Sequence, residues 1–139
     1  MSLEKSPVTF VATSDLCAIT KGRAVLTEDL KAGGSTGWVP ANLGIGASGQ
    51  IVDQIPFGST GDLRLAPDPS SERVISGVPG RPDTAMVLAD IVTTDGRPWA
   101  CCPRTFLREA VRTLREEFGL TMESAFEHEF MALDVDDEH

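Results

Sequence analysis

Residues 84–93 read Thr-Ala-Met-Val-Leu-Ala-Asp-Ile-Val-Thr and form the most continuous apolar run in the chain. A short apolar run bounded by turn signals is typical of a strand inside a sheet, with both of its faces covered. Asp95-Gly96 follows and predicts a turn. We therefore place residues 84–93 at the centre of a sheet and build the remaining elements outward from it.

The segments before this run predict most of the other strands. Residues 7–15 alternate apolar and polar side chains, which predicts a strand with one mostly apolar face. Residues 18–26 predict a second strand, with a kink or bulge at residues 21–23. Thr27 offers an N-cap hydroxyl for a helix of one or two turns at most, because Gly33 and Gly34 follow soon after. Two further short strands are predicted over residues 62–66 and 73–76.

Residues 33–61 have a different composition, because they hold 8 of the 13 glycines. Regular structure over this stretch would cost backbone entropy, so we expect a long loop with one short strand at residues 50–55. Loops of this length are usually functional or disordered, and Trp38 slightly favours function. Residues 44–49 match a dinucleotide-binding pattern by letter, but lack the preceding strand and following helix that the pattern requires. We interpret that match as a coincidence.

One long helix is predicted over Pro103–Phe118. Pro103 suits the first helical position, and Gly119 suits the C-terminal cap. The charged residues of this segment are expected on solvated flanks. Six apolar residues recur at three- and four-residue spacing and predict one apolar stripe: Phe106, Leu107, Ala110, Val111, Leu114 and Phe118.

Composition excludes several classes of protein. The 139 residues are enough for one domain. A net charge of −9 argues against a protein that binds nucleic acid or an anionic membrane surface. No stretch is apolar enough to span a bilayer. The three cysteines, two of them adjacent, form neither a disulfide framework nor a metal-binding pattern, so we expect a reducing, cytoplasmic location.

The candidate metal ligands are Glu127 and Glu129, within Phe-Glu-His-Glu-Phe at residues 126–130. If residues 123–135 form a strand, these two side chains lie on the same face, because side chains alternate along a strand. Two carboxylates projecting together suit hard cations such as Mg²⁺ or Mn²⁺. An exposed strand edge with two acids and inward-facing phenylalanines explains the spacing equally well. From the residues alone, both interpretations remain open.

Taken in order, five pieces of the chain resemble the N-terminal end of glutamine synthetase family enzymes. The family pattern has a strand entering a Pro-Asp turn, a strand ending in Asp, a Pro-Arg helix start and a Glu-x-Glu-Phe metal strand. The spacing between the pieces agrees as well. The matching pieces are residues 61–69, 85–90, 95–98, 103–104 and 127–130.

This resemblance implies an α+β fold in two parts. Residues 1–100 would form a β-grasp-like mixed sheet of about five strands with a crossing helix. Residues 101–139 would begin a catalytic domain, with a linker helix over 103–118 and a metal-ligand strand over 123–135. Because the chain stops just after that strand, we expect the strand to be mobile or to pair with a second copy.

The resemblance also implies an activity for a longer parent protein. Family members form rings and use ATP to activate the γ-carboxylate of glutamate as an acyl phosphate, which ammonia or an amine then attacks. Glu127 and Glu129 would be the first two carboxylate ligands, one for each of two divalent ions. The 139 residues alone are expected to be inactive and to hold neither ATP nor a metal.

The resemblance leaves open which nitrogen compound accepts the γ-glutamyl group. The standard bacterial enzymes carry an Asp-Gly-Ser-Ser segment in an N-terminal loop, and residues 33–61 contain no clear counterpart. A γ-glutamyl-amine ligase, of polyamine type for example, is therefore an alternative to an ammonia-using enzyme. A binding or assembly module without activity is the third hypothesis.

Overall fold

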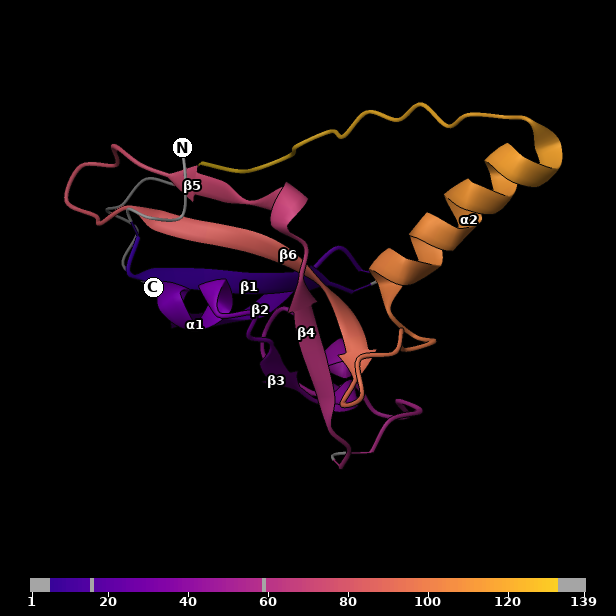
Figure 1. The fold of residues 1–139 in the computed structure, drawn as a ribbon, viewed down its shortest axis with the longest axis horizontal. Helices are drawn as coiled ribbons and strands as arrows, with labels where there is room; N and C mark the ends of the chain where they lie inside the picture. The colour runs from indigo at the N-terminus through magenta and orange to yellow at the C-terminus, as the bar shows by residue number, and fades with distance from the viewer. Residues whose placement is uncertain (1–5, 16, 59, 133–139) are drawn as a thin grey trace.

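The computed structural model describes residues 6–15, 17–58 and 60–132, and its centre is one curled mixed sheet (Figure 1). The strand order is β2-β1-β6-β4-β3, and β5 pairs with β6 beside this path. β1 and β6 are parallel, and the other pairs are antiparallel. The strands are β1 (Val8–Ser14), β2 (Thr20–Leu26), β3 (Thr36–Trp38), β4 (Leu63–Pro67), β5 (Arg73–Ile75) and β6 (Thr84–Thr93).

The predicted central strand is confirmed, with the same bounds as β6. β6 is hydrogen-bonded to β1 on one side and to β4 on the other, and β5 lies alongside its first half. Its burial differs from the prediction, because only every second residue is fully enclosed: Ala85, Val87, Ala89 and Ile91. The sheet therefore buries one face of its middle strand rather than both.

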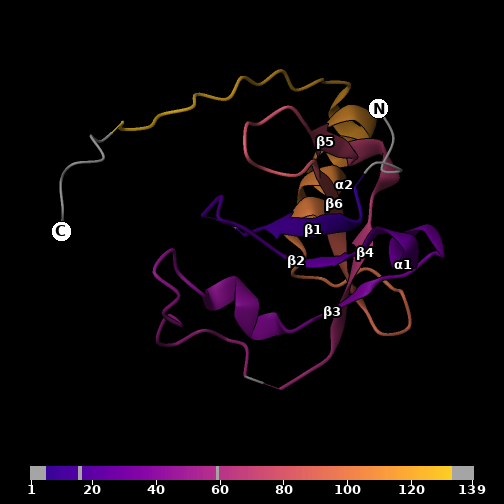
Figure 2. The ribbon, with the colours of Figure 1, turned by 90° about the vertical axis from the view of Figure 1, so that its left-hand side faces the viewer.

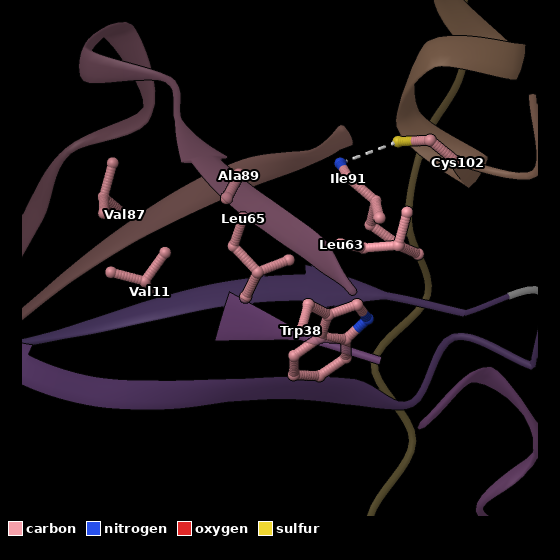
Figure 3. Packing of buried hydrophobic residues seen from close by; sticks show 8 residues of the cluster. All are labelled: Val11, Trp38, Leu63, Leu65, Val87, Ala89, Ile91 and Cys102. Carbon is pink, nitrogen blue, oxygen red and sulfur yellow. Dashed lines mark hydrogen bonds between the residues drawn. The ribbon is translucent and has the colours of Figure 1, made fainter. Parts of the chain in front are cut away.

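The buried face forms a single core at the inside of the curl. Figure 3 shows this cluster, which joins residues of β1, β3, β4 and β6 to Cys102 at the start of the long helix. Cys102 is fully buried, and its Sγ accepts a hydrogen bond from the Ile91 N–H at 3.2 Å. The cluster consists of Val11, Trp38, Leu63, Leu65, Val87, Ala89, Ile91 and Cys102.

Two helices accompany the sheet, α1 (Thr27–Lys31) and α2 (Pro103–Phe118). α2 has the predicted bounds, and Gly119 ends it in the left-handed conformation with φ +65°. The predicted N-cap role of Thr27 is wrong, because Leu26 occupies the cap position and Thr27 is buried inside α1. The Thr27 hydroxyl instead shares a hydrogen bond of 2.8 Å with that of Thr9. Among the described residues, neither helix has the length and apolar character needed to cross a bilayer.

Two predictions for the first half of the chain are also wrong. Residues 21–23 pair in regular register with β1 and form no bulge. The strand expected at residues 50–55 is reduced to one isolated bridge between Ile45 and Ile51. A strand does form in this stretch, but it is β3, and it is followed by the 3₁₀ turn Pro40–Gly44. A second 3₁₀ turn, Pro69–Ser71, follows β4.

The architecture is the α+β, β-grasp-like fold that the resemblance implies. The sheet curls so far that its two edge strands, β2 and β3, face each other (Figure 2). α2 extends away from one end of the sheet, and residues 119–132 run on from it as a separate extended segment. The division of the chain at residue 100 stays a prediction.

Candidate functional site

The two predicted metal ligands lie on the extended segment after α2. Glu127 and Glu129 are both exposed, and residues 119–132 contain neither helix nor strand. The strand predicted over residues 123–135 is therefore absent from 123–132, while residues 133–135 lie outside the described part. The physical reason is that a strand needs a neighbour to hydrogen-bond with, and no strand of the sheet pairs with this segment.

The donor atoms suit a hard divalent cation, but the set is incomplete. Two glutamate carboxylates supply the oxygen ligands that Mg²⁺ and Mn²⁺ prefer. Within the described residues, no group of three or more His, Cys, Asp or Glu side chains gathers in a way that could hold a metal. Any site that uses Glu127 and Glu129 would need ligands from outside these residues.

The large apolar residues of this region are also uncovered. Phe126 and Phe130 expose 86% and 90% of their surface. The apolar stripe predicted for α2 includes Phe106, which is 69% exposed, and no residue of α2 is buried. Phe106 borders an apolar cavity of about 480 Å³ between the start of α2 and residues 55–57. These surfaces would be covered only by contacts that the described residues do not make.

Three of the family-like pieces meet in one ion-pair cluster at the base of α2. Arg104 donates from Nη2 to Asp68 Oδ2 at 2.7 Å and from Nε to Asp90 Oδ1 at 3.0 Å. Arg108, one turn later, donates to the other oxygen of Asp90 at 2.6 Å. The Pro-Asp turn, the Asp within β6 and the Pro-Arg helix start thus form one joint between sheet and helix. We call these four residues the α2 joint.

The carboxylate of Asp68 is held ionised by its own turn as well as by the α2 joint. The hydroxyl and the N–H of Ser70 both donate to Asp68 Oδ1, at 2.7 and 3.1 Å. These bonds, chiefly that of the hydroxyl, lower the pKa of Asp68 below its usual value of 3.8, and Arg104 adds to the effect although partial burial opposes it. Likewise, the hydrogen bond to Asp90 raises the pKa of Arg108. The contacts of the joint therefore favour the charged forms of Asp68 and Arg108.

The prediction that the charged residues of α2 lie on solvated flanks is wrong for Arg104, whose side chain is only 23% exposed and pairs with two carboxylates. It is right for Arg108, which is 53% exposed although it also reaches Asp90. It holds for the neighbouring charges, because Glu109, Arg112 and Glu116 pair only with one another and are more than half exposed. The sequence places Asp68 directly after β4, Asp90 within β6 and Arg104 at the second position of α2. Only the register of β4 against β6, in which Ala66 lies opposite Asp90, shows that the two aspartates converge.

Comparisons with known proteins show the family of the chain. The family model of the glutamine synthetase N-terminal domain matches residues 3–99. The chain belongs to this family. The match includes the Asp68 and Asp90 side of the α2 joint and ends before α2 begins.

Individual relatives extend the similarity into the C-terminal segment. Glutamine synthetase of Methanosarcina mazei is 26% identical over 137 residues, 97% of this chain and 29% of that protein. Gamma-glutamylpolyamine synthetase GlnA3 of Streptomyces coelicolor is 32% identical over 124 residues, which cover 87% of this chain and 26% of that protein. The chain therefore spans less than a third of the length of these two relatives.

Solved structures support the fold assignment. A crystal structure described as a novel glutamine synthase homolog superposes with a TM-score of 0.71 at 37% identity, covering 84% of this chain and 28% of the other. The cryo-EM structure of Plasmodium falciparum glutamine synthetase reaches a TM-score of 0.60 at 13% identity, covering 84% and 21% of the two chains. The second similarity concerns the fold alone.

Proposed function

We propose that this chain is the N-terminal part of an ATP-dependent ligase that joins ammonia or an amine to the γ-carboxylate of glutamate through γ-glutamyl phosphate. The observation that carries the proposal is the family match over residues 3–99. A glutamine synthetase that is 26% identical over 97% of the chain extends this similarity beyond residue 99. The remaining ligands and the pockets for ATP and glutamate would lie in sequence beyond these 139 residues.

In this proposal, Glu127 and Glu129 each provide a carboxylate to one of two Mg²⁺ or Mn²⁺ ions. Bound divalent ions would neutralise the phosphate charge that develops during transfer. The exposure of Glu127 and Glu129 on a segment that pairs with no strand supports this role. Both carboxylates stay free of ion pairs within the described residues, so both are available to bind a cation. The α2 joint would fix the helix that leads to them. We further propose a cytoplasmic homo-oligomeric ring, whose other parts would cover the apolar residues that are now exposed.

A second candidate is a γ-glutamyl-amine ligase that uses an acceptor larger than ammonia. Two relatives favour it: the gamma-glutamylpolyamine synthetase named above, and a glutamate–isopropylamine ligase of a Pseudomonas species, 39% identical over 72 residues, 52% of this chain and 15% of that protein. Residues 33–61, which have no Asp-Gly-Ser-Ser segment, are the part of this chain where such enzymes would be expected to differ.

The deciding experiment measures phosphate release from ATP by the full-length protein, with glutamate and Mg²⁺ present. The acceptor is varied from ammonium through isopropylamine to spermidine. Release that requires ammonium identifies a glutamine synthetase, whereas preference for a larger amine identifies a γ-glutamyl-amine ligase. Absence of release with every acceptor contradicts the ligase proposal and favours a binding or assembly module.

The ligand roles need a separate test with a matched control. Glu127→Gln and Glu129→Gln should each weaken binding of Mn²⁺ to the full-length protein, measured by titration calorimetry without substrates. Glu123→Gln changes an exposed glutamate of the same segment and should leave Mn²⁺ binding unchanged. Equal Mn²⁺ affinity in all three variants would contradict the assignment of Glu127 and Glu129 while leaving the ligase activity to be judged by phosphate release.

A further inference from the structure

A second cavity, of about 450 Å³, lies where the two edges of the curled sheet approach each other. One wall is β2, including Lys21 and Arg23, and the opposite wall is the loop after β3, including Asn42 and Gly46. Trp38, at the end of β3, forms part of the lining. The Lys21 ammonium ties the two walls together by donating to the Asn42 carbonyl oxygen at 2.8 Å. We call this space the seam cavity.

Trp38 presents an unused hydrogen-bond donor in this region. The residue is only 4% exposed and packs in the core, and its indole Nε1 has no hydrogen-bond partner among the described residues. A buried donor without a partner costs about 1–3 kcal/mol, so native structures rarely keep one without a reason. Because the same side chain lines the seam cavity, the missing acceptor could be supplied by a molecule bound there.

The two cations of the seam cavity differ in what they are free to bind. Lys21 is paired with Asp15 at 2.6 Å, and both side chains are nearly buried, at 12% and 7% exposure. Arg23 is exposed, and the structure gives its side chain no ion pair or hydrogen bond among the described residues. In a chain with a net charge of −9, an unpaired guanidinium at the mouth of a cavity favours an anion at that point.

The loop at the cavity wall is held mainly by local bonds. The Gly46 N–H donates to the Gln50 carbonyl at 2.8 Å, and the Gly49 N–H donates to the Gly46 carbonyl at 3.0 Å. Gly49 has φ +79°, which favours glycine, and a Cβ at Gly46 would meet no atom closer than 3.7 Å. Because the Trp38 nitrogen is enclosed, an acceptor reaches it only when neighbouring atoms move, and this turn, which lines the same cavity, is the segment we take to move.

We propose that the seam cavity binds a small oxyanion, a carboxylate or phosphate, with one oxygen on Trp38 Nε1 and its charge facing Arg23. The glycine-rich turn moves to admit it and then closes over it. This site lies in the N-terminal sheet and uses neither Glu127 nor Glu129. The anion-binding proposal can therefore be tested independently of the proposed ligase activity.

The test uses the 139-residue chain labelled with ¹⁵N and follows the indole N–H signals of its two tryptophans. The spectrum of Trp99→Phe assigns the Trp38 signal. The probes are inorganic phosphate, succinate and uncharged succinamide, at constant ionic strength. We expect a saturable downfield shift of the Trp38 indole proton with phosphate, succinate or both, and none with succinamide. Saturation by only one anion identifies which chemistry the site selects.

Two variants separate a site from general ionic attraction. Arg23→Gln should weaken anion binding about tenfold, as expected when a charged hydrogen bond is lost. Arg81→Gln removes another exposed arginine, which lies in the loop between β5 and β6 and does not line the cavity, and should leave the affinity within about twofold of wild type, because it only changes net charge. An unmoved Trp38 signal, an equal response to succinamide, or equal weakening in both variants would overturn the proposal.

Discussion

Arg104 and Asp68 are 36 positions apart in the chain, yet Arg104 Nη2 lies 2.7 Å from Asp68 Oδ2. The same guanidinium donates from Nε to Asp90, so it bridges the turn after β4 and the middle strand β6. α2 buries none of its residues, and these charged contacts together with the buried Cys102 attach its start to the sheet. The direction in which α2 leaves the sheet therefore depends on polar contacts more than on apolar packing.

Replacing Arg104 by lysine should loosen this attachment. Lysine keeps the charge but cannot donate to both carboxylates with a planar fork. Because the three side chains are 22–32% exposed, we expect a loss of only about 1 kcal/mol in the free energy of unfolding. Urea unfolding measures it, and hydrogen exchange should become faster in the first turn of α2. Arg115→Lys, on the exposed end of the same helix, is the control, and equal effects of both changes would contradict this role.

Acid should also remove the stability that the ion pair of Asp15 and Lys21 adds to the free energy of unfolding. Burial raises the pKa of Asp15, but hydrogen bonds from Lys21 and from the N–H groups of Ile19 and Cys17 outweigh it and hold the pKa below 3.8. The ionised carboxylate therefore stabilises the fold above the unfolded-state pKa. This contribution is lost as the pH falls through the lower folded-state pKa.

Asp15→Asn should accordingly cost about 2 kcal/mol near pH 7, because it leaves the nearly buried Lys21 charge without its partner. The difference from wild type should begin to shrink below about pH 4, where Asp15 of the unfolded chain becomes protonated, and should vanish once the folded-state carboxylate is protonated as well. Urea unfolding at several pH values measures this, with Asp53→Asn on the exposed loop as the control. A difference that is constant with pH would contradict the assignment.

The strands and the long helix were predictable because their signals are local. The alternation of residues 7–15, the apolar run of 84–93, and Pro103 with Gly119 specify elements without knowledge of the fold. β3 was missed because Thr36-Gly-Trp38 is too short to show a period. It becomes a strand only by pairing with β4 and by burying Trp38 in the core.

The candidate sites were less predictable because each depends on contacts between distant segments. The α2 joint needs the register of β4 against β6, and the seam cavity needs the sheet to curl until β2 and β3 face each other. The strand expected around Glu127 fails for the same reason. Its local pattern is strand-like, but strand formation needs a neighbour, and the sheet offers this segment none.

The three cysteines should react very differently with alkylating reagents. Cys17 and Cys101 are exposed, whereas Cys102 is fully buried and its sulfur accepts the Ile91 N–H. Under native conditions, iodoacetamide should therefore add two groups, and a third should appear only in urea. Mass spectrometry of the intact chain and its peptides measures this. Rapid modification of Cys102 in the folded chain would show that the start of α2 is not held against the core.

Gly22 should tolerate no larger residue, although the reason differs from the bulge predicted at this position. A Cβ there would lie 2.2 Å from the Val11 carbonyl oxygen and 2.9 Å from the Ala12 Cα, both backbone atoms of β1. Since a backbone atom within a paired strand cannot move without breaking the register, Gly22→Ala should cost about 2–3 kcal/mol in unfolding free energy.

The matched change is Gly46→Ala, where the nearest atom to the new Cβ is the Gln50 carbonyl oxygen at 3.7 Å. Alanine also restricts the unfolded chain, so this variant should be as stable as wild type or more stable by about 0.5 kcal/mol. Urea midpoints compare the two. Equal stability of both variants would mean that the β1–β2 hairpin separates easily, and the wall of the seam cavity that β2 provides would then be compliant rather than fixed.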